Sequence, residues 1–208
     1  MRTFCFNSFA SDNYLKKVDF YPKTEDDVFF RWVTDIRIQG NLLAAVVNFD
    51  HKIYLFNIAS ELDLAGMIGG PGEGPGELIL PVNANVSKDE IAVIDETGVS
   101  FFKLTGEFAT KFRLFSPNRN FVYKNDKVYL SNPVPEKPHL INVFKKSGEL
   151  VGEFGDKAYK PDYNKFKGMS PFEVEKRVNG GMLLGGDNCL YHLNAYFGEI
   201  VKYSLSCV

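Results

Sequence analysis

The feature that most constrains the fold is a hairpin that recurs along the chain. The clearest copies are 99–108 and 141–150, in which two apolar runs flank Gly106-Glu107 and Gly148-Glu149. Weaker copies lie at 191–201, with Gly198-Glu199 at the turn, and at 53–64, with Ser60-Glu61 there. The turns are roughly 40 to 50 residues apart, which is the period of repeat architectures such as propellers. Each copy predicts a strand, a tight turn and a returning strand.

A second pair of short apolar runs precedes every hairpin. The paired runs are 35–38 with 42–47, 82–86 with 90–94, 120–123 with 127–130, and 172–178 with 182–184. Polar turn residues, among them Gly40-Asn41 and Asn125-Asp126, separate the two runs of a pair. Each unit therefore holds four short strands, which is the composition of one propeller blade.

The predicted fold is all-β: a β-propeller of four-stranded antiparallel blades, of which four are visible. The expected blades span about 32–68, 78–115, 119–156 and 172–205, and residues 1–31 form an N-terminal segment or edge strand. A parallel sheet with crossover helices would need long amphipathic segments of period 3.6, and none is convincing. The content of 19 Phe and 10 Tyr also favours strands over helices.

The link between the first two units carries a family resemblance. The segment 69–78 reads Gly-Gly-Pro-Gly-Glu-Gly-Pro-Gly-Glu-Leu and resembles the GPGE connector of the bacterial six-bladed β-propeller family related to NHL repeats and TolB. The similarity extends over residues 32–114, through Lys52–Phe56 before the connector and Ala92–Asp95 after it. The third and fourth units match only as generic blades. The resemblance implies six blades and a protein that is commonly exported, often as a lipoprotein.

The blade count departs from that family. Six blades of this size would need roughly 276 residues, and the chain has 208. Three explanations stay open: a part of a six-bladed protein, an unusual four-bladed ring, or an arc whose open faces are covered by another chain. An open arc would leave apolar faces uncovered and favour self-association.

The N-terminus and the composition limit compartment and partners. No signal-peptide apolar stretch follows Met1, so the chain as written is expected to be cytoplasmic, whereas a truncated start would allow export to the periplasm. No run of about 18 apolar residues is present, so no membrane span is expected. The net charge of -2, with no basic block, makes nucleic acid an unexpected partner.

The Gly-rich connector is expected to shape the backbone rather than to bind phosphate. It has no Gly-Lys-Ser/Thr ending and no complete G-x-G-x-x-G, whereas glycine and proline together allow a sharp turn between blades. The three cysteines and three histidines have no metal-ligand spacing, so neither a metal nor a cofactor is predicted. A bridge between Cys189 and Cys207 stays open without being implied.

Function is expected on one loop face of the propeller. Turns between second and third strands meet there with the links between blades, and such loops usually carry function. The predicted ligand-binding residues are Asp50, His51, Glu73, Glu77, Asp95, Arg119 and Asp187. The long loop 154–171 alternates lysines with aromatic residues and would suit a glycan or a peptide if it is more than a solvated loop.

The leading hypothesis is a non-catalytic binding or scaffold module for a protein, glycan or small-molecule ligand. The alternative is a propeller-type hydrolase or lyase acting on a glycan or small molecule, which requires carboxylates and a histidine from different blades to converge. The two hypotheses differ in whether His51, Asp95 and Asp187 come within hydrogen-bonding distance of one another.

Overall fold

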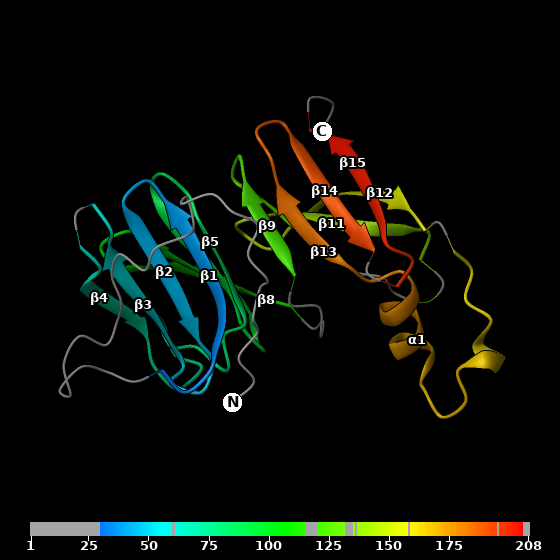
Figure 1. Cartoon of the computed structure of the whole chain (residues 1–208), viewed down its shortest axis with the longest axis horizontal. Coiled ribbons are helices and arrows are strands. Elements are labelled where there is room, and N and C mark those ends of the chain that lie inside the picture. The colour runs from blue at the N-terminus through cyan, green and yellow to red at the C-terminus, as the bar shows by residue number, and fades with distance from the viewer. Residues whose placement is uncertain are drawn as a thin grey trace, which may run out of the picture.

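The computed structural model consists of four antiparallel sheets that follow one another around an arc (Figure 1). It describes residues 30–59, 61–114, 120–131, 135, 137–157, 159–194 and 196–205. Within these residues there are fifteen strands, one α-helix and one short 3-10 helix. The all-β prediction and the propeller arrangement are confirmed.

Strand order follows chain order within every sheet. The first sheet contains β1 (Val33–Gln39), β2 (Leu42–Val47), β3 (Lys52–Asn57) and β4 (Asp63–Gly69). The second contains β5 (Asn83–Val86), β6 (Glu90–Ile94), β7 (Gly98–Lys103) and β8 (Phe108–Arg113). The third contains β9 (Phe121–Lys124), β10 (Lys127–Ser131), β11 (His139–Lys145) and β12 (Leu150–Asp156). The fourth contains β13 (Met182–Gly185), β14 (Cys189–Asn194) and β15 (Glu199–Ser204).

Turn residues set these hairpins. Asn125 and Asp126, between β9 and β10, both have positive φ, at 51° and 56°, as a two-residue type I′ hairpin requires. Gly106 and Gly148 have φ of 88° and 86° at the third-to-fourth-strand turns of the second and third sheets. The repeated Gly-Glu signal therefore marks the same turn in both sheets.

Apolar side chains fill the space between neighbouring sheets. Ile53, Leu78 and Phe102 belong to the cluster between the first and second sheets. Phe101 and Phe121 belong to the next cluster, and a third cluster joins the third and fourth sheets. Among the described residues, no cluster joins the fourth sheet to the first, so the arc is open there. The outer face of the first sheet is partly covered by Phe30, which packs on Tyr54 at 4.7 Å.

A polar cluster also crosses the boundary between the second and third sheets. The Tyr123 hydroxyl lies 2.8 Å from Glu90 Oε2 and 3.0 Å from Asp126 Oδ1, and Lys146 Nζ donates to the same Glu90 oxygen at 2.7 Å. Burial, together with these two carboxylates, raises the pKa of Tyr123. The phenol therefore stays protonated and able to donate at neutral pH.

The innermost strands β1, β5, β9 and β13 line the axis and are linked by side-chain bonds to backbone atoms. Asp35 of β1 accepts from Ala84 N in β5 at 3.0 Å. Asn85 of β5 donates to Phe121 O in β9 at 3.1 Å. Asn120 donates to Gly181 O, just before β13, at 3.1 Å. These bonds fix the order of the sheets around the axis.

The strand expected at 172–178 is wrong, because residues Pro171–Val178 form helix α1. Pro171 occupies its first turn, and Ser170 and Glu173 form a capping box, a combination that favours a helix start. Hydrogen bonds from the Ser170 backbone and hydroxyl lower the pKa of the Glu173 carboxyl.

Because of this helix, each segment of the fourth sheet occupies a different strand position from the one predicted. The innermost strand is β13 rather than a strand at 172–178, and the fourth sheet has three strands where four were expected. Gly198 consequently lies in the turn between its second and third strands, unlike Gly106 and Gly148.

Some sequence predictions fall outside the described residues. These are the N-terminal segment up to residue 29, Arg119, Cys5 and Cys207. Cys189 is described and is a buried free thiol. No helix within the described ranges has the length and apolar character needed to cross a membrane.

We expect Phe101→Ala to lower the free energy of unfolding by about 3–5 kcal/mol, because a large side chain is removed from a packed interface. Phe101 is 0% exposed and contacts the rings of Phe112 and Tyr123. Urea denaturation measures the change. The matched control is Phe49→Ala, at a ring that is 55% exposed, where a loss below about 1 kcal/mol is expected. Equal losses at both positions would contradict the placement of the inter-sheet core.

Candidate functional site

The connector 70–82 joins the first and second sheets as an ordered loop. Gly72 and Gly76 have φ of 148° and 81°, so glycines of segment 72–77 allow the sharp turn between blades that the sequence predicts for this connector. Leu78 is fully buried in the core, and its N–H donates to Gly70 O at 2.7 Å. The connector is therefore held at both ends and positions the loops around it.

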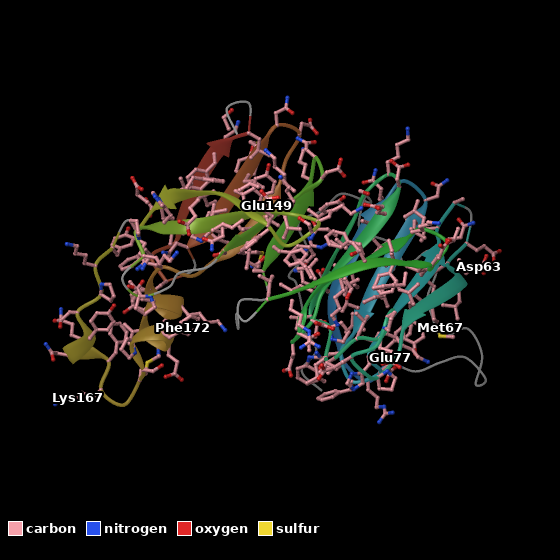
Figure 2. The ribbon with its side chains drawn as sticks, turned by 180° about the vertical axis from the view of Figure 1, so that it is seen from behind. Asp63, Met67, Glu77, Glu149, Lys167 and Phe172 are labelled. Carbon is pink, nitrogen blue, oxygen red and sulfur yellow. The ribbon has the colours of Figure 1, made fainter. Side chains whose placement is uncertain are left out.

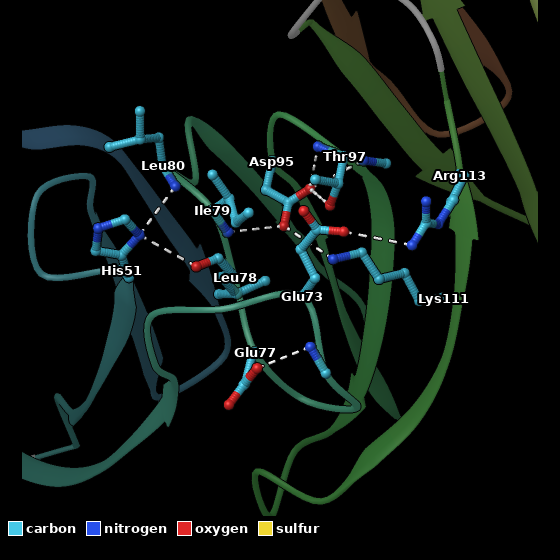
Figure 3. A network of polar contacts seen from close by, with 12 residues as sticks. His51, Glu73, Glu77, Leu78, Ile79, Leu80, Asp95, Thr97, Lys111 and Arg113 are labelled. Carbon is cyan, nitrogen blue, oxygen red and sulfur yellow. Dashed lines mark hydrogen bonds and ion pairs between the residues drawn. The ribbon is translucent and has the colours of Figure 1, made fainter.

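His51 anchors the connector from the turn between β2 and β3 (Figure 3). Its Nδ1 lies 3.1 Å from both Leu80 N and Leu78 O. One ring nitrogen makes only one of these bonds in a given tautomer: it accepts from Leu80 N–H when unprotonated and donates to Leu78 O when protonated. Either tautomer binds the connector. His51 and Leu80 also have positive φ, at 56° and 47°, a conformation uncommon outside glycine.

Asp95 has its carboxylate saturated by structural bonds. Its Oδ1 accepts from the backbone N–H and hydroxyl of Thr97, both at 2.7 Å, and from Gly98 N at 2.9 Å. Its Oδ2 accepts from Ile79 N at 3.0 Å and from Lys111 Nζ at 3.1 Å. The side chain is fully buried. Asp95 therefore ties the connector to the turn between β6 and β7 and leaves no lone pair directed at a ligand.

The other predicted site residues on the first two sheets are engaged in local contacts. Glu77 accepts from Gly74 N at 2.7 Å, and Glu73 pairs with Arg113 at 3.4 Å across an exposed surface. Asp50 accepts from the Tyr54 hydroxyl at 3.1 Å. The structure groups these side chains on one face, as expected, but each has a partner within the protein.

The face that carries the connector 70–82, the turns 48–51 and 95–97 and helix α1 is called the connector face. Figure 2 shows Glu77 and Phe172 toward this end of the molecule and Glu149 toward the other. Asp187 was expected here, but it lies between β13 and β14, a first-to-second-strand turn on the opposite face. The convergence of Asp187 with His51 and Asp95 that the hydrolase or lyase alternative requires is therefore not seen.

A cavity of about 320 Å³ opens on the connector face at the axis. All four sheets contribute to this axial cavity through positions at or beside the ends of their first or second strands: Thr34, Val82, Asn83, Asn120, Ser131 and Gly181. Lys176 of α1 and Gly180, which follows the helix, complete the lining. Both glycines are needed for close packing, since an added Cβ would lie 2.0 Å from Lys176 O or 2.1 Å from Leu193 O.

Two polar atoms of this lining are buried without a hydrogen-bond partner in the described structure. They are the Oγ of Ser131, a residue only 2% exposed, and the Oδ1 of Asn120. Buried polar atoms in native proteins are nearly always paired, so unpaired ones require an explanation such as a ligand or water. The axial cavity therefore offers hydrogen-bonding capacity that the protein itself leaves unused.

His192 lies next to this lining, on the inner side of the fourth sheet. Its side chain is buried, its Nε2 has no partner among the described residues, and a Cβ at Gly181 would lie 2.8 Å from that nitrogen. Burial lowers the pKa of His192, and the nearby Glu199 opposes this weakly. The imidazole is therefore neutral at pH 7 and adds no charge near the axial cavity.

A second cavity, of about 500 Å³, lies between the third sheet and α1. The predicted loop 154–171 is shorter in the structure, because residues 154–156 belong to β12 and Pro171 to α1. Tyr159, Lys160 and Tyr163 from the segment between these two elements line the cavity. Its buried carboxylate, Glu175, pairs with Lys157 at 3.1 Å and accepts from Asn179 at 2.9 Å. The Glu175 carboxylate is thus bonded within the protein, whereas the buried side-chain oxygen atoms of Asn120 and Ser131 in the axial cavity are not bonded to any described residue.

Sequence reasoning missed Thr34, Asn120, Ser131 and Lys176. The available signal was a polar residue at the start of successive inner strands, as at Thr34, Asn83 and Asn120. This pattern could not be extended to the fourth unit, because 172–178 was predicted as its first strand. Within the described residues, no group of three or more His, Cys, Asp or Glu side chains is placed to hold a metal ion.

The similarity to known proteins lies in the fold. No protein-family model matches the chain, and no curated protein matches it. A Bacteroides fragilis protein assigned as exported superposes with a TM-score of 0.59 at 20% identity, over 87% of this chain and 52% of its own. Hydrazine synthase from Kuenenia stuttgartiensis gives 0.57 at 11% identity, over 90% and 50%. Hsv2 from Kluyveromyces lactis gives 0.52 at 11%, over 84% and 46%.

These identities show a shared fold and no more. The chain spans about half the length of each of these three structures. The match supports the assignment of consecutive propeller blades, in agreement with the sheet order, and it assigns neither a ligand nor a reaction.

We expect Asp95→Ala to lower the free energy of unfolding by about 3–5 kcal/mol, because it leaves the Lys111 ammonium and several amides without their buried acceptor. Urea denaturation measures this. Glu73→Ala is the matched control, since its partner Arg113 is solvent-exposed and such pairs contribute little. If Asp95→Ala leaves stability unchanged, Asp95 does not hold the connector and its turn together.

Proposed function

We propose that the chain is a non-catalytic binding module of β-propeller type whose ligand or partner binds on the connector face. The observation that carries this proposal is the axial cavity, because all four sheets contribute to its lining. Rigid strand ends hold its polar atoms in place, and preformed concave sites of this kind suit small ligands. In this proposal His51 and Asp95 support the rim through their bonds to the connector. Glu73 and Glu77 belong to the connector itself, and Asp50 bonds to Tyr54 in the first sheet beside it. Arg119 and Asp187 are not used in this proposal.

We also propose that the chain belongs to the bacterial six-bladed propeller family related to NHL repeats and TolB. The support is the GPGE connector, with its confirmed turn geometry, and the resemblance over residues 32–114. Export from the cytoplasm is part of this family proposal.

The open ends of the arc supply a further interaction surface in this proposal. On the fourth sheet, Met182 and Ile200 lie on the side away from the third sheet, 48% and 67% exposed. On the first sheet, Ile36 and Met67 are 56% and 51% exposed on the corresponding outer side. Both surfaces belong to the same molecule and are apolar, so the end faces of two copies can cover each other.

The binding proposal predicts where small molecules perturb the protein. In a two-dimensional amide NMR spectrum recorded with a mixture of metabolites, the shifted resonances should cluster around Asn120, Ser131 and Gly181. The reason is that the axial cavity combines a preformed shape with unsatisfied polar atoms. One-dimensional spectra of the same samples over a day should show the compounds unchanged.

Two outcomes would contradict this proposal. Shifts confined to the opposite face, around Asp187, would place binding elsewhere. Conversion of a bound compound into product would favour the alternative of a propeller-type hydrolase or lyase.

The end-face proposal predicts self-association that depends on concentration. Size-exclusion chromatography with light scattering should show a mass above that of one chain at high concentration. The double variant Met182→Lys, Ile200→Lys should shift the equilibrium to the monomer, because it places two charges on the uncovered face. The control is Lys103→Ala, on an exposed position of the second sheet. A wild-type chain that stays monomeric at all concentrations would contradict the proposal.

A further inference from the structure

The unpaired polar atoms of the axial cavity define what a ligand there must provide. Asn120 uses its Nδ2 to donate to Gly181 O at 3.1 Å, which leaves its Oδ1 as an acceptor without a donor. Ser131 has a hydroxyl that can both donate and accept, and neither capacity is used within the described residues. A fitting ligand must therefore carry at least one hydrogen-bond donor for Asn120 and a group that bonds to a hydroxyl.

The axial cavity has room for more than a single bridging water. A water molecule takes up about 30 Å³ in the liquid, so the cavity of about 320 Å³ has room for roughly ten. A volume of this size falls at the lower end of the range for small-molecule sites. The ligand is accordingly a small molecule rather than a polymer segment.

Lys176 gives the axial cavity its charge. It is the one charged side chain among the described lining residues, and no described carboxylate lines the cavity with it. No ion pair or hydrogen bond of its ammonium occurs within the described part of the chain. The next residue, Arg177, is an exposed cation in the same last turn of α1 but does not line the cavity. The favourable interaction of a cation with the helix C-terminus therefore applies to both residues, whereas only Lys176 can meet a ligand.

The donor set distinguishes a carboxylate from a phosphate. Phosphate sites usually combine several cationic or backbone N–H donors, often an arginine fork or a helix N-terminus. Here one lysine stands beside neutral hydroxyl and amide groups, and α1 directs its C-terminus toward the cavity. A single negative charge with hydroxyl groups matches this lining better than a phosphate dianion.

We propose that the axial cavity binds a small hydroxylated carboxylate, with the carboxylate on Lys176 and the ligand hydroxyls on Ser131 and Asn120. This rests on the proposed binding function and specifies its ligand class. A hydroxyl satisfies both remaining requirements, since it donates to Asn120 Oδ1 and exchanges a hydrogen bond with Ser131 Oγ. A carboxylate without hydroxyls offers no donor and would leave Asn120 unpaired.

Isothermal titration calorimetry with matched pairs tests the ligand class. The carboxylates are lactate, gluconate and glucuronate, and their neutral counterparts are propane-1,2-diol, sorbitol and glucose. At least one carboxylate should bind at least tenfold more tightly than its neutral counterpart. Butyrate, which lacks hydroxyls, and glucose 6-phosphate should bind more weakly than that carboxylate.

Three variants assign the contacts. Lys176→Gln should weaken the bound carboxylate about tenfold or more and remove its advantage over the neutral counterpart. Arg177→Gln, in the same helix turn, should change affinity less than twofold. Ser131→Ala should also weaken binding about tenfold while leaving the melting temperature of the ligand-free protein unchanged or raised, because its hydroxyl has no partner to lose. If the serine were purely structural, Ser131→Ala would lower the melting temperature and leave the affinity for the carboxylate unchanged.

Each remaining outcome overturns the proposal in a recognisable way. Binding of the neutral compounds as tightly as the carboxylates, with amide shifts at Ser131 and Gly181, would overturn the charge assignment and leave the binding function intact. Tighter binding of glucose 6-phosphate would assign the cavity to phosphates. Absence of binding by all of these compounds would overturn the ligand class, and the metabolite mixture then decides separately whether the connector face binds any ligand.

Discussion

Every β-sheet in this chain has two faces to cover, and the rest of the structure depends on how that requirement is met. The second and third sheets are covered on both sides by three apolar clusters, whose buried members include Phe102 in the first, Phe101 in the second and Tyr129 in the third. Burial of such side chains is worth roughly 1.5–3 kcal/mol each, so face-to-face packing is the main source of stability. Among the described residues, the first and fourth sheets each pack against one neighbouring sheet, and exposed apolar residues such as Ile36 and Ile200 lie on their other sides.

Packing sheet against sheet also brings the inner strands together at the axis. Their side chains there bond to the backbone of the next sheet, as Asp35 does to Ala84 and Asn85 to Phe121. Each such bond contributes only about 1 kcal/mol, and its value lies in fixing the position of each strand relative to its neighbour. At the connector face the strand ends surround the axial cavity, and all four sheets contribute residues to its polar lining.

The repeat, the turn positions and the connector geometry were predictable because they depend on local signals. Gly106, Gly148 and the glycines of segment 72–77 occupy backbone conformations that few other residues adopt. The error at 172–178 arose because apolar residues in a short segment fit both a strand and a helix. Ser170, Pro171 and Glu173 carried the deciding helix-start signal. That one error shifted the predicted strand order of the fourth sheet by one strand, and it therefore assigned Asp187 to the wrong face.

The candidate site was harder to predict, since it depends on which distant segments meet. Charged residues in turns attract notice in a sequence, yet Asp95 is fully occupied by the bonds that hold its own turn. The unused polar atoms belong instead to Asn120 and Ser131, whose roles follow from the meeting of strand ends from different sheets. Asn120 fits the pattern of a polar residue at the start of successive inner strands, whereas Ser131 has no such signal.

Lys176 reaches the axis only because a helix stands where the repeat would place a strand. The connector 70–82 is held by structural bonds, whereas the position at which the repeat is broken leaves a residue free for another role. In this chain that position supplies the only charge in the lining of the axial cavity among the described residues. The departure from the repeat and the charge of the cavity are therefore two consequences of the same helix.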